Sequence, residues 1–370
     1  MQLTDNKFIA IIIITTVISY FYCIIINFIS KNFGIIDKSF KKSQTAHLKS
    51  TSRLGGLGIL LSIITIEIIF SGIFRIWFFI SLIPIFTIGL IEDLHIDTKP
   101  YLRLLVGVIS SLLAIYLSQY WLKSVDFPLV DKILSISFFG IAFTVFASVG
   151  MINAINLIDG IHGFAAAKVV LISIGIFLIS SKVGENRIAV MAALLAASSL
   201  GLFFISFPNG KLFLGDAGAY SLGFLIGWQI IILLSRNPEL SAWSLLALVF
   251  WPVMDTLFSI FRRMMKGKST NKPDLLHFHQ LIMRFLEIIS RKKISRVKSN
   301  PLSTAIIIPF SIIPIIFGIK YSHDNTAGIK IVIISTLIYI MSYYGIINLI
   351  KYKKYRDIMV KLTYKFWSKI

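Results

Sequence analysis

Long apolar runs alternate with short polar segments along most of the chain. About 20 helical residues are needed to cross a bilayer core about 30 Å thick, and apolar runs of about that size recur through the sequence. About eleven such runs are present, at residues 8–30, 54–73, 76–91, 101–119, 132–151, 165–181, 188–206, 217–235, 243–261, 303–319 and 329–350. The pattern predicts an all-α, polytopic integral membrane protein with about eleven transmembrane helices.

Composition supports this class. Apolar residues make up 56% of the 370 residues, and the mean hydropathy is +0.83, which is too high for a soluble core. No internal repeat or soluble domain is evident, so residues 1–370 are predicted to form a single membrane-embedded domain. The first run is too long for a signal-peptide core and is expected to remain as a helix. Cys23 is the only cysteine, which excludes a disulfide framework and a cysteine-based metal cluster.

The positions of the basic residues predict the orientation. With the N-terminus outside, 27 of the 37 Lys and Arg residues fall on the inner side and 8 on the outer side. The positive-inside rule therefore favours an N-out, C-in topology. The net charge of +20 is explained by this topology and by anionic lipid headgroups, and nucleic acid is not expected as a partner.

Five polar segments interrupt the apolar runs on the same predicted inner face. They are residues 47–56, 92–93, 153–159, 210–218 and 274–280. Carboxylates next to a bilayer are costly unless they are compensated, so they mark functional sites by default. The five junctions are expected to converge on one site at the cytosolic membrane surface.

The order of these motifs resembles the polyprenyl-phosphate N-acetylhexosamine-1-phosphate transferase superfamily, over about residues 31–285. The carrying motifs are Glu92-Asp93, Asn153-x-x-Asn156-x-x-Asp159-Gly160, Gly215-Asp216-x-Gly218 and His277-x-His279. The resemblance implies magnesium-dependent transfer of a sugar 1-phosphate from a UDP-sugar to a lipid phosphate, with release of UMP. The lipid phosphate would attack directly or through an aspartyl intermediate.

Asp216 is the first candidate for the metal ligand. Magnesium uses one or two protein carboxylates and completes its shell with phosphate and water, and the small neighbours Gly215 and Gly218 would let a diphosphate come close. The family's Gly-Asp-x-Gly motif implies the same role. Manganese could replace magnesium, and the alternative is a solvated turn aspartate.

The adjacent acids Glu92 and Asp93 follow the third predicted span. Two neighbouring carboxylates need a shared cation or proton, and one of them could orient the metal or act as a base toward the lipid phosphate. The family usually has Asp-Asp here, so the acceptor-side catalytic role is assigned to Asp93 first and to Glu92 second. An interfacial acidic pair at a helix end is the alternative.

Asn153, Asn156 and Asp159 recur at every third residue, which on a helix would place them within one arc of about 120°. The resemblance assigns this element to the nucleotide and metal region, with Asp159 as the essential catalytic member and the two asparagines binding substrate. Asparagines that join membrane helices are the alternative for Asn153 and Asn156.

His277 and His279 lie in the longest inner loop. Residues two apart share one side only in an extended segment, so the two imidazoles could grip the donor pyrophosphate if this stretch is not helical. The family's histidine-rich motif here implies the same role. A transition-metal pair is the weaker alternative, because two histidines without another ligand make a poor zinc site.

The segment from His47 to Gly56 completes the set. Arg53 and Lys49 offer charge complementary to phosphate, and glycines at the predicted helix start permit close backbone approach. His47 and Arg53 are therefore substrate-binding candidates. Small-residue helix packing would also explain the glycines.

The predicted function is transfer of an N-acetylhexosamine 1-phosphate from a UDP-sugar to undecaprenyl phosphate, which starts O-antigen or another envelope polysaccharide. Muropeptide-precursor transfer is less expected, because that branch usually carries three adjacent histidines. The competing class is a membrane transporter in which acids such as Glu67 and Asp255 mark an ion path. A homodimer is compatible with the sequence.

Overall fold

The computed structural model describes residues 6–35, 51–96, 98–267, 274, 276–290, 294–352 and 359, and within these ranges the chain is helical with no strands. The helices are α1 (Asn6–Asn32), α2 (Gly55–Ile69), α3 (Ile76–Asp93), α4 (Pro100–Ser118), α5 (Pro128–Leu134), α6 (Ser137–Leu157), α7 (Phe164–Lys182), α8 (Asn186–Ser206), α9 (Gly215–Arg236), α10 (Ala242–Leu248), α11 (Phe250–Met265), α12 (Phe278–Ile289), α13 (Arg296–Lys320) and α14 (Asn325–Lys351). The predicted all-α class is confirmed.

Each predicted apolar run coincides with a helix, but not every one is long enough to cross a bilayer. Within the described ranges, nine helices have the length and hydropathy of a membrane span, and the bent pair α10 and α11 would make a tenth. The run at 54–73 differs, because α2 ends at Ile69 after 15 residues. The Glu67 side chain accepts hydrogen bonds from the amides of Gly72 (2.7 Å) and Phe74 (2.9 Å), so it stabilises the turn that follows α2.

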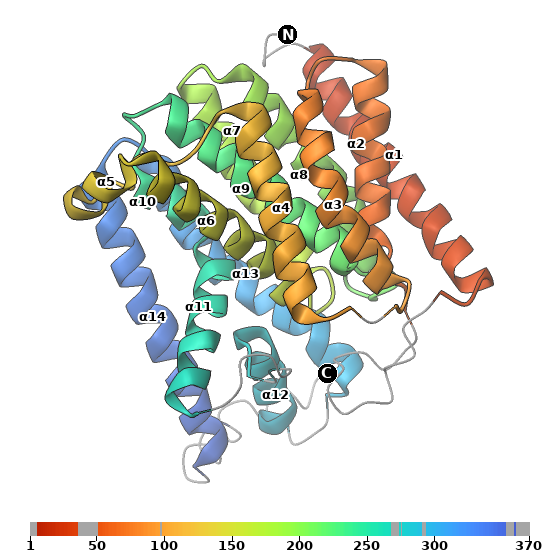
Figure 1. Ribbon diagram of the computed structural model, residues 1–370. Coiled ribbons are helices and arrows are strands. Elements are labelled where there is room, and N and C mark those ends of the chain that lie inside the picture. Colours follow the sequence, from red (N-terminus) through yellow and green to blue (C-terminus); the bar gives the residue numbers. More distant parts are fainter. Residues whose placement is uncertain are drawn as a thin grey trace.

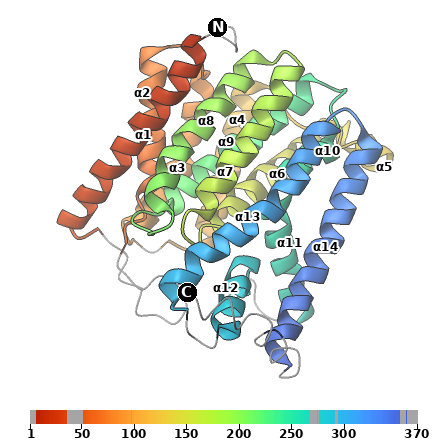
Figure 2. The ribbon, with the colours of Figure 1, turned by 180° about the vertical axis from the view of Figure 1, so that it is seen from behind.

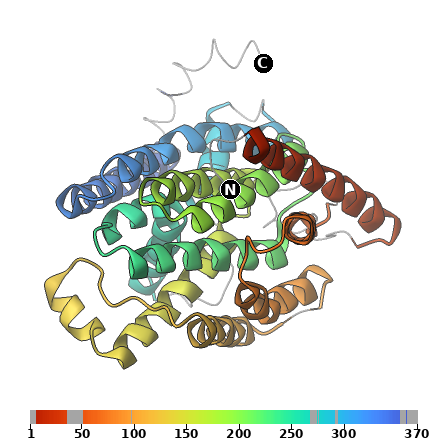
Figure 3. The ribbon, with the colours of Figure 1, turned by 90° about the horizontal axis from the view of Figure 1, so that it is seen from above.

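The helices differ strongly in burial. In the most apolar window of each helix, 89% of the residues of α9 and 83% of those of α8 are buried, compared with 28% for α1 and α4 and 11% for α14. Figure 3 agrees with this difference in burial, because α7, α8 and α9 lie in the middle of the bundle and α1, α4, α5 and α14 lie at its periphery. The exposed apolar faces of the peripheral helices fit contact with lipid.

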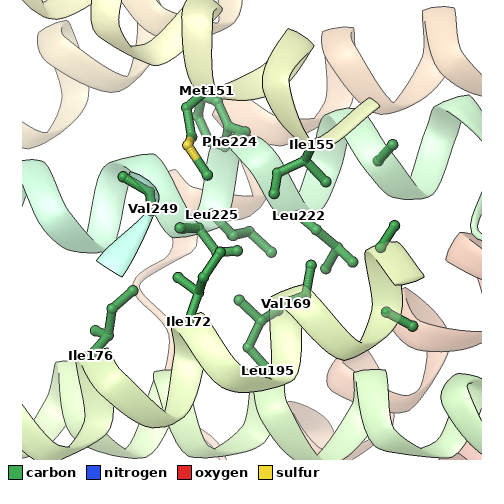
Figure 4. Packing of buried hydrophobic residues seen from close by; sticks show 14 of the residues in the cluster. Met151, Ile155, Val169, Ile172, Ile176, Leu195, Leu222, Phe224, Leu225 and Val249 are labelled. Atoms are coloured by element: carbon green, nitrogen blue, oxygen red, sulfur yellow. The ribbon is translucent and has the colours of Figure 1, made fainter. Parts of the chain in front are cut away.

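The centre of the bundle is packed by branched aliphatic side chains from several helices. Ile155 of α6, Val169 and Ile172 of α7, and Leu222 of α9 interdigitate there (Figure 4) and are at most slightly exposed. Lipid tails are as apolar as these side chains, so close packing rather than water exclusion must hold membrane helices together. This core fixes the depth and direction of α9, whose first turn carries Asp216.

A sharp bend divides the predicted run at 243–261. The axes of α10 and α11 meet at 86°, with Val249 between them. Pro252 lies in the first turn of α11 and has no amide hydrogen to donate to the carbonyl of Leu248, so a continuous helix would lose a bond there. The predicted run at 243–261 is therefore covered by two helices joined at a bend, and α11 then contacts the start of α12 through Asp255.

The polar junctions meet at one end of the bundle. The ends of α1, α3, α6 and α8 and the starts of α2, α4, α7 and α9 lie at the lower end in Figure 1, together with α12, and Figure 2 shows the same end from behind. Where the structure describes them, the polar junctions that were predicted to converge lie together at this end of the bundle. His47 and Lys49 lie outside the described residues.

Candidate active site

The junction before α2 pairs with the junction before α9. An isolated parallel bridge joins Ser52 and Leu212, and the amide of Phe213 donates to the carbonyl of Ser52 (3.0 Å). The first amides of α2, at Gly55 and Gly56, donate to the carbonyls of residues 213 and 214 (2.8 Å each). These bonds use amides that a helix start leaves without intrahelical partners, and they place residue 53 beside the start of α9.

Gly215 is required at this contact. Its φ is +75°, and a Cβ added there would lie 1.7 Å from the carbonyl oxygen of Arg53 and 2.8 Å from Oδ1 of Asp93. Both the backbone conformation and the space exclude a larger side chain. The glycine therefore lets the segment at 53, the end of α3 and the start of α9 meet.

Two aspartates from other segments cap the first turn of α9. Asp93 accepts from the amides of Asp216 and Ala217, one at each carboxylate oxygen (2.8 Å each). Oδ2 of Asp159 accepts from the amide of Gly215 (3.0 Å). A helix N-terminus carries partial positive charge and unpaired amides, which explains how Asp93, only 2% exposed, is accommodated. The sequence pattern gave no sign of this backbone role for Asp93.

Asp216 occupies the same turn, with its side chain on the site. Its Oδ1 accepts a hydrogen bond from the side-chain amide of Asn156. Burial is the main cause that raises the pKa of Asp159 to about 7, and the charge of Asp216 adds to it, whereas the Gly215 amide and the Arg53 guanidinium lower it. The carboxylates of Asp159 and Asp216 thus repel each other, an arrangement that favours binding of a cation.

Glu92, next to Asp93 in the sequence, has its own set of polar partners. Thr98 and the guanidinium of Arg103 (3.3 Å) both donate to its carboxylate, as does the hydroxyl of Tyr220 (3.2 Å). The two acids that are adjacent in sequence therefore have different partners, and the ion pair with Arg103 compensates Glu92 locally.

Asn153 is not joined to this group by a side-chain bond. Its amide donates to the carbonyl of Val149 one turn earlier (2.8 Å), whereas Asn156 reaches Asp216. The helix ends at Leu157, so Asp159 lies in the following turn and not on the helical arc predicted from the spacing of three. That part of the prediction was wrong.

The two histidines lie side by side at the start of α12. His277 is the residue before the helix and has extended backbone angles, φ −63° and ψ 150°. The imidazoles of His277 and His279 are nearly parallel, with centroids 5.8 Å apart. A Cβ added to Gly160 would lie 2.4 Å from Nε2 of His279, so His279 packs against the turn that carries Asp159. The backbone is extended at His277 and helical from Phe278 onward, and this change of conformation brings the two imidazoles to one side.

Three residues outside the predicted set support the site. The side chain of His162 is 7% exposed, its Nδ1 bonds to the carbonyl of Pro208 (2.7 Å), and its amide donates to Asn300 of α13 (2.7 Å). Asp255 and Tyr220 also bond to site residues. The position of the Asp255 carboxylate within a predicted apolar run is the sequence signal for such a role.

The carboxylates fit a magnesium ion by the chemistry of their oxygen atoms. Within the described ranges, no group of three or more His, Cys, Asp or Glu side chains is arranged to hold a metal. Magnesium needs only one or two carboxylates when phosphate and water complete its shell. The hydrogen bonds of Asp159 and Asp216 each use one oxygen, Oδ2 and Oδ1 respectively, which leaves the other oxygen of each for a hard cation.

The chain is similar to known bacterial transferases. The model of glycosyl transferase family 4 matches residues 75–234. An undecaprenyl-phosphate alpha-N-acetylglucosaminyl 1-phosphate transferase of Pasteurella multocida is 30% identical over 271 residues, 69% of this chain and 73% of that protein. A probable undecaprenyl-phosphate N-acetylglucosaminyl 1-phosphate transferase of Bacillus subtilis is 28% identical over 272 residues, with coverage of 70% and 73%. The Thermotoga maritima protein with the same activity in its name is 27% identical over 269 residues, with coverage of 72% and 79%.

Proposed function

This chain belongs to glycosyl transferase family 4, and we propose that it transfers an N-acetylhexosamine 1-phosphate from a UDP-sugar to undecaprenyl phosphate. A lipid phosphate oxygen forms a bond to the sugar-linked phosphorus, and the bond from that phosphorus to UMP breaks. The names of the similar bacterial proteins support undecaprenyl phosphate as acceptor and N-acetylglucosamine as the sugar.

The observation that carries this proposal is the first turn of α9. Asp93, Asp159 and Asp216 come from three segments and meet there, because the glycine at 215 lets these segments pack closely. Phosphoryl transfer depends on positioning and on stabilising charge rather than on covalent chemistry by the protein. Carboxylates held in fixed positions by backbone hydrogen bonds suit that demand.

We propose that Asp216, together with Asp159, holds magnesium, or manganese in its place. When bound, the cation offsets the negative charge of the donor diphosphate. Asn156 orients Asp216 through Oδ1, and Asp93 fixes the turn from which Asp216 projects. Arg53 supplies positive charge next to these acids, complementary to phosphate.

The remaining residues divide between the two substrates. His277 and His279 are proposed to bind the donor diphosphate, because their rings are stacked and His279 packs against the Asp159 turn. Asp93 and Glu92 are proposed for the acceptor side, since both lie where α3 ends. Asn153 and His47 remain candidates for donor contacts. The acceptor lipid would enter sideways from the membrane.

The cellular setting is part of the same proposal. The site would face the cytosol at the inner membrane, where UDP-sugars are available, and the product would start O-antigen or another envelope polysaccharide. Glu67 stabilises a turn and Asp255 is bonded to His277, so neither acid supports the alternative of an ion path through the bundle.

The test uses purified protein with magnesium, undecaprenyl phosphate and a panel of UDP-sugars, followed for UMP. We expect UMP release with at least one UDP-N-acetylhexosamine, and only when the lipid acceptor is present. Absence of UMP with every sugar, or release that ignores the lipid, would overturn the proposed reaction.

A further inference from the structure

Asp255 is a buried carboxylate that gathers donors from two other helices. It lies in α11 and is 1% exposed. Its Oδ2 is 2.9 Å from Nδ1 of His277, and its Oδ1 accepts from the amide of Phe278 (3.0 Å) and from the hydroxyl of Tyr339 in α14 (2.6 Å). The carboxylate therefore caps the start of α12 and ties it to the last membrane helix.

Burial of the Asp255 carboxylate would cost free energy if its negative charge were not compensated. An isolated carboxylate in apolar surroundings would be strongly destabilised, and partners that donate hydrogen bonds offset that cost. Trp251, Phe258 and Phe278 all pack against the ring of Tyr339, so the apolar surroundings and the position of the hydroxyl are both fixed. The contacts with the Phe278 amide and the Tyr339 hydroxyl therefore hold the Asp255 carboxylate in one orientation.

The direction of Asp255 fixes the direction of His277. Its contact is with Nδ1, where Ser259 also lies at 3.3 Å. The described part of the chain offers no hydrogen-bond partner to Nε2. A carboxylate on one ring nitrogen sets the tautomer and leaves the other nitrogen for a ligand. His279 stacks on the same ring and limits its rotation.

The charge of the ring follows from the same contacts. Burial by itself lowers the pKa of His277, but the charge and hydrogen bond of Asp255 raise it above the ordinary value, with Asp274 adding to this and Arg262 opposing it. A protonated imidazole donates from Nε2, and a donor with positive charge makes a strong hydrogen bond to a phosphate oxygen.

We propose that Asp255 is a positioning residue of the transfer reaction, which holds Nδ1 of His277 so that Nε2 is presented to the donor diphosphate, with Tyr339 holding Asp255 in turn. This inference rests on the proposed function for the identity of the ligand. It adds α11 and α14 to the elements that shape the donor site.

A double-mutant cycle tests the proposal through kcat and the KM for the UDP-sugar. Asp255→Asn and His277→Ala should each reduce kcat/KM by about tenfold or more, the worth of one charge-assisted hydrogen bond. If Asp255 acts through His277, the double variant should lose no more than His277→Ala alone. Losses that multiply in the double variant would show independent effects and would overturn the positioning role.

Tyr339→Phe gives the same test without removing the carboxylate, and it decides the question if Asp255→Asn does not fold. It should cause a smaller loss that disappears in the His277→Ala background, whereas a loss that persists there contradicts the proposal. Tyr344→Phe is the matched control on α14, because Tyr344 is 50% exposed and should keep full activity.

The tautomer of His277 separates this inference from the proposed function. Nitrogen-15 spectra of histidine-labelled protein, assigned with His277→Ala, should show a proton on Nδ1 in the wild type and a changed signal in Asp255→Asn or Tyr339→Phe. Lack of a proton on Nδ1 in the wild type would overturn the positioning role even in an active enzyme. A proton on Nδ1 in a protein that turns over no UDP-sugar would support the contact and reject the reaction.

Discussion

Asp216 combines three properties at a single residue. It lies in the first turn of α9, a neighbouring amide orients one of its oxygens, and Asp93 anchors its own backbone amide. The Asp216 side chain is thus held in one position. A ligand held in this way loses little conformational freedom when a cation and a diphosphate bind.

Asp216→Asn should therefore fold and insert normally but lose turnover by about 100-fold or more, because a neutral amide cannot replace the charge that holds the cation. UMP release measured across a range of magnesium concentrations checks this. Asp324→Asn is the matched control. Asp324 caps α14 through Ala327 at the opposite end of the bundle, and asparagine caps as well, so its activity should not change. Near-normal turnover of Asp216→Asn would remove the metal assignment.

His279 shows how a buried polar group couples stability to pH. It is 2% exposed, and neither ring nitrogen has a partner in the described chain. Burial is the main cause that lowers its pKa from 6.5 to about 4. The folded protein therefore keeps this ring neutral, while the unfolded chain takes up a proton near pH 6.5.

Stability should consequently fall as the pH drops from 6.5 toward 4, since the unfolded state binds more protons in this window. For this one group the loss between pH 7.5 and 5 is about 2 kcal/mol. Thermal unfolding in detergent should show a smaller acid-induced drop in Tm for His279→Gln than for the wild type. His323→Gln, at an exposed loop, should behave as the wild type. Equal drops in all three proteins would contradict the buried neutral state.

At the scale of elements, the crossing of α2 and α9 decides where the first turn of α9 lies. A Cβ added to Gly56 would be 2.0 Å from Cα of Gly218, and one added to Gly218 would be 2.6 Å from Cα of Gly56. Close approach of this kind is typical of small residues at membrane helix interfaces. The nearby backbone on both sides leaves no room for adjustment without moving a helix.

Gly218→Ala should therefore separate the two helices, lower stability by about 1–3 kcal/mol and reduce activity through displacement of Asp216. Gly150→Ala in α6 is the control, because a Cβ at Gly150 meets nothing within 4 Å, and alanine favours a helix by about 1 kcal/mol. Thermal unfolding and UMP release on both variants make the comparison. A Gly218→Ala protein as stable and active as Gly150→Ala would show that this contact is not required.

The helices that the sequence predicted and those that it missed differ in how their signals arise. Long apolar runs predicted the spans because the bilayer itself imposes length and hydropathy. The helix α12 is amphipathic, with Phe278, Leu281, Ile282 and Leu286 buried. It has 12 residues, so its apolar period of three to four residues is a weaker signal than the long apolar runs of the membrane spans. The bend at 249 depends on Pro252 and on tertiary contacts of α11. The sequence motifs could assign Asn156 and Asp216 to the same site. They could not predict that Asp93 caps α9, because this role depends on how α3 meets α9, which no local pattern encodes.

At the scale of the whole molecule, the site depends on helices beyond the region matched by the family model. That match ends at residue 234, whereas Asn300 of α13 accepts from the amide of His162, and Tyr339 of α14 bonds to Asp255. The C-terminal helices thus hold two sides of the same end of the bundle. Contacts of this kind between the C-terminal helices and the site are expected if the chain forms one membrane-embedded domain.

The distribution of basic residues along the sequence predicts the orientation of the molecule. In the predicted N-out topology, 27 of the 37 Lys and Arg residues fall in inner segments and 8 in outer segments. Because basic residues close to spans are retained in the cytosol, the end with Asp216 should face inward, where UDP-sugars are found.

Cysteine labelling in intact cells tests this orientation. Cys23 is fully buried, so the unmodified protein should show little reaction with a membrane-impermeant thiol reagent and serves as the control. Asn32, the last residue of α1, and His323, in the turn between α13 and α14, are both exposed. Figure 1 shows the end of α1 toward the lower end and the turn between α13 and α14 at the upper end. His323→Cys should be labelled directly, whereas Asn32→Cys should be labelled only after permeabilisation. Both variants should retain UMP release, since neither residue lies in the proposed site. The reverse labelling pattern would place the carboxylates on the outer surface, away from the proposed donor, and would contradict both the topology and the reaction.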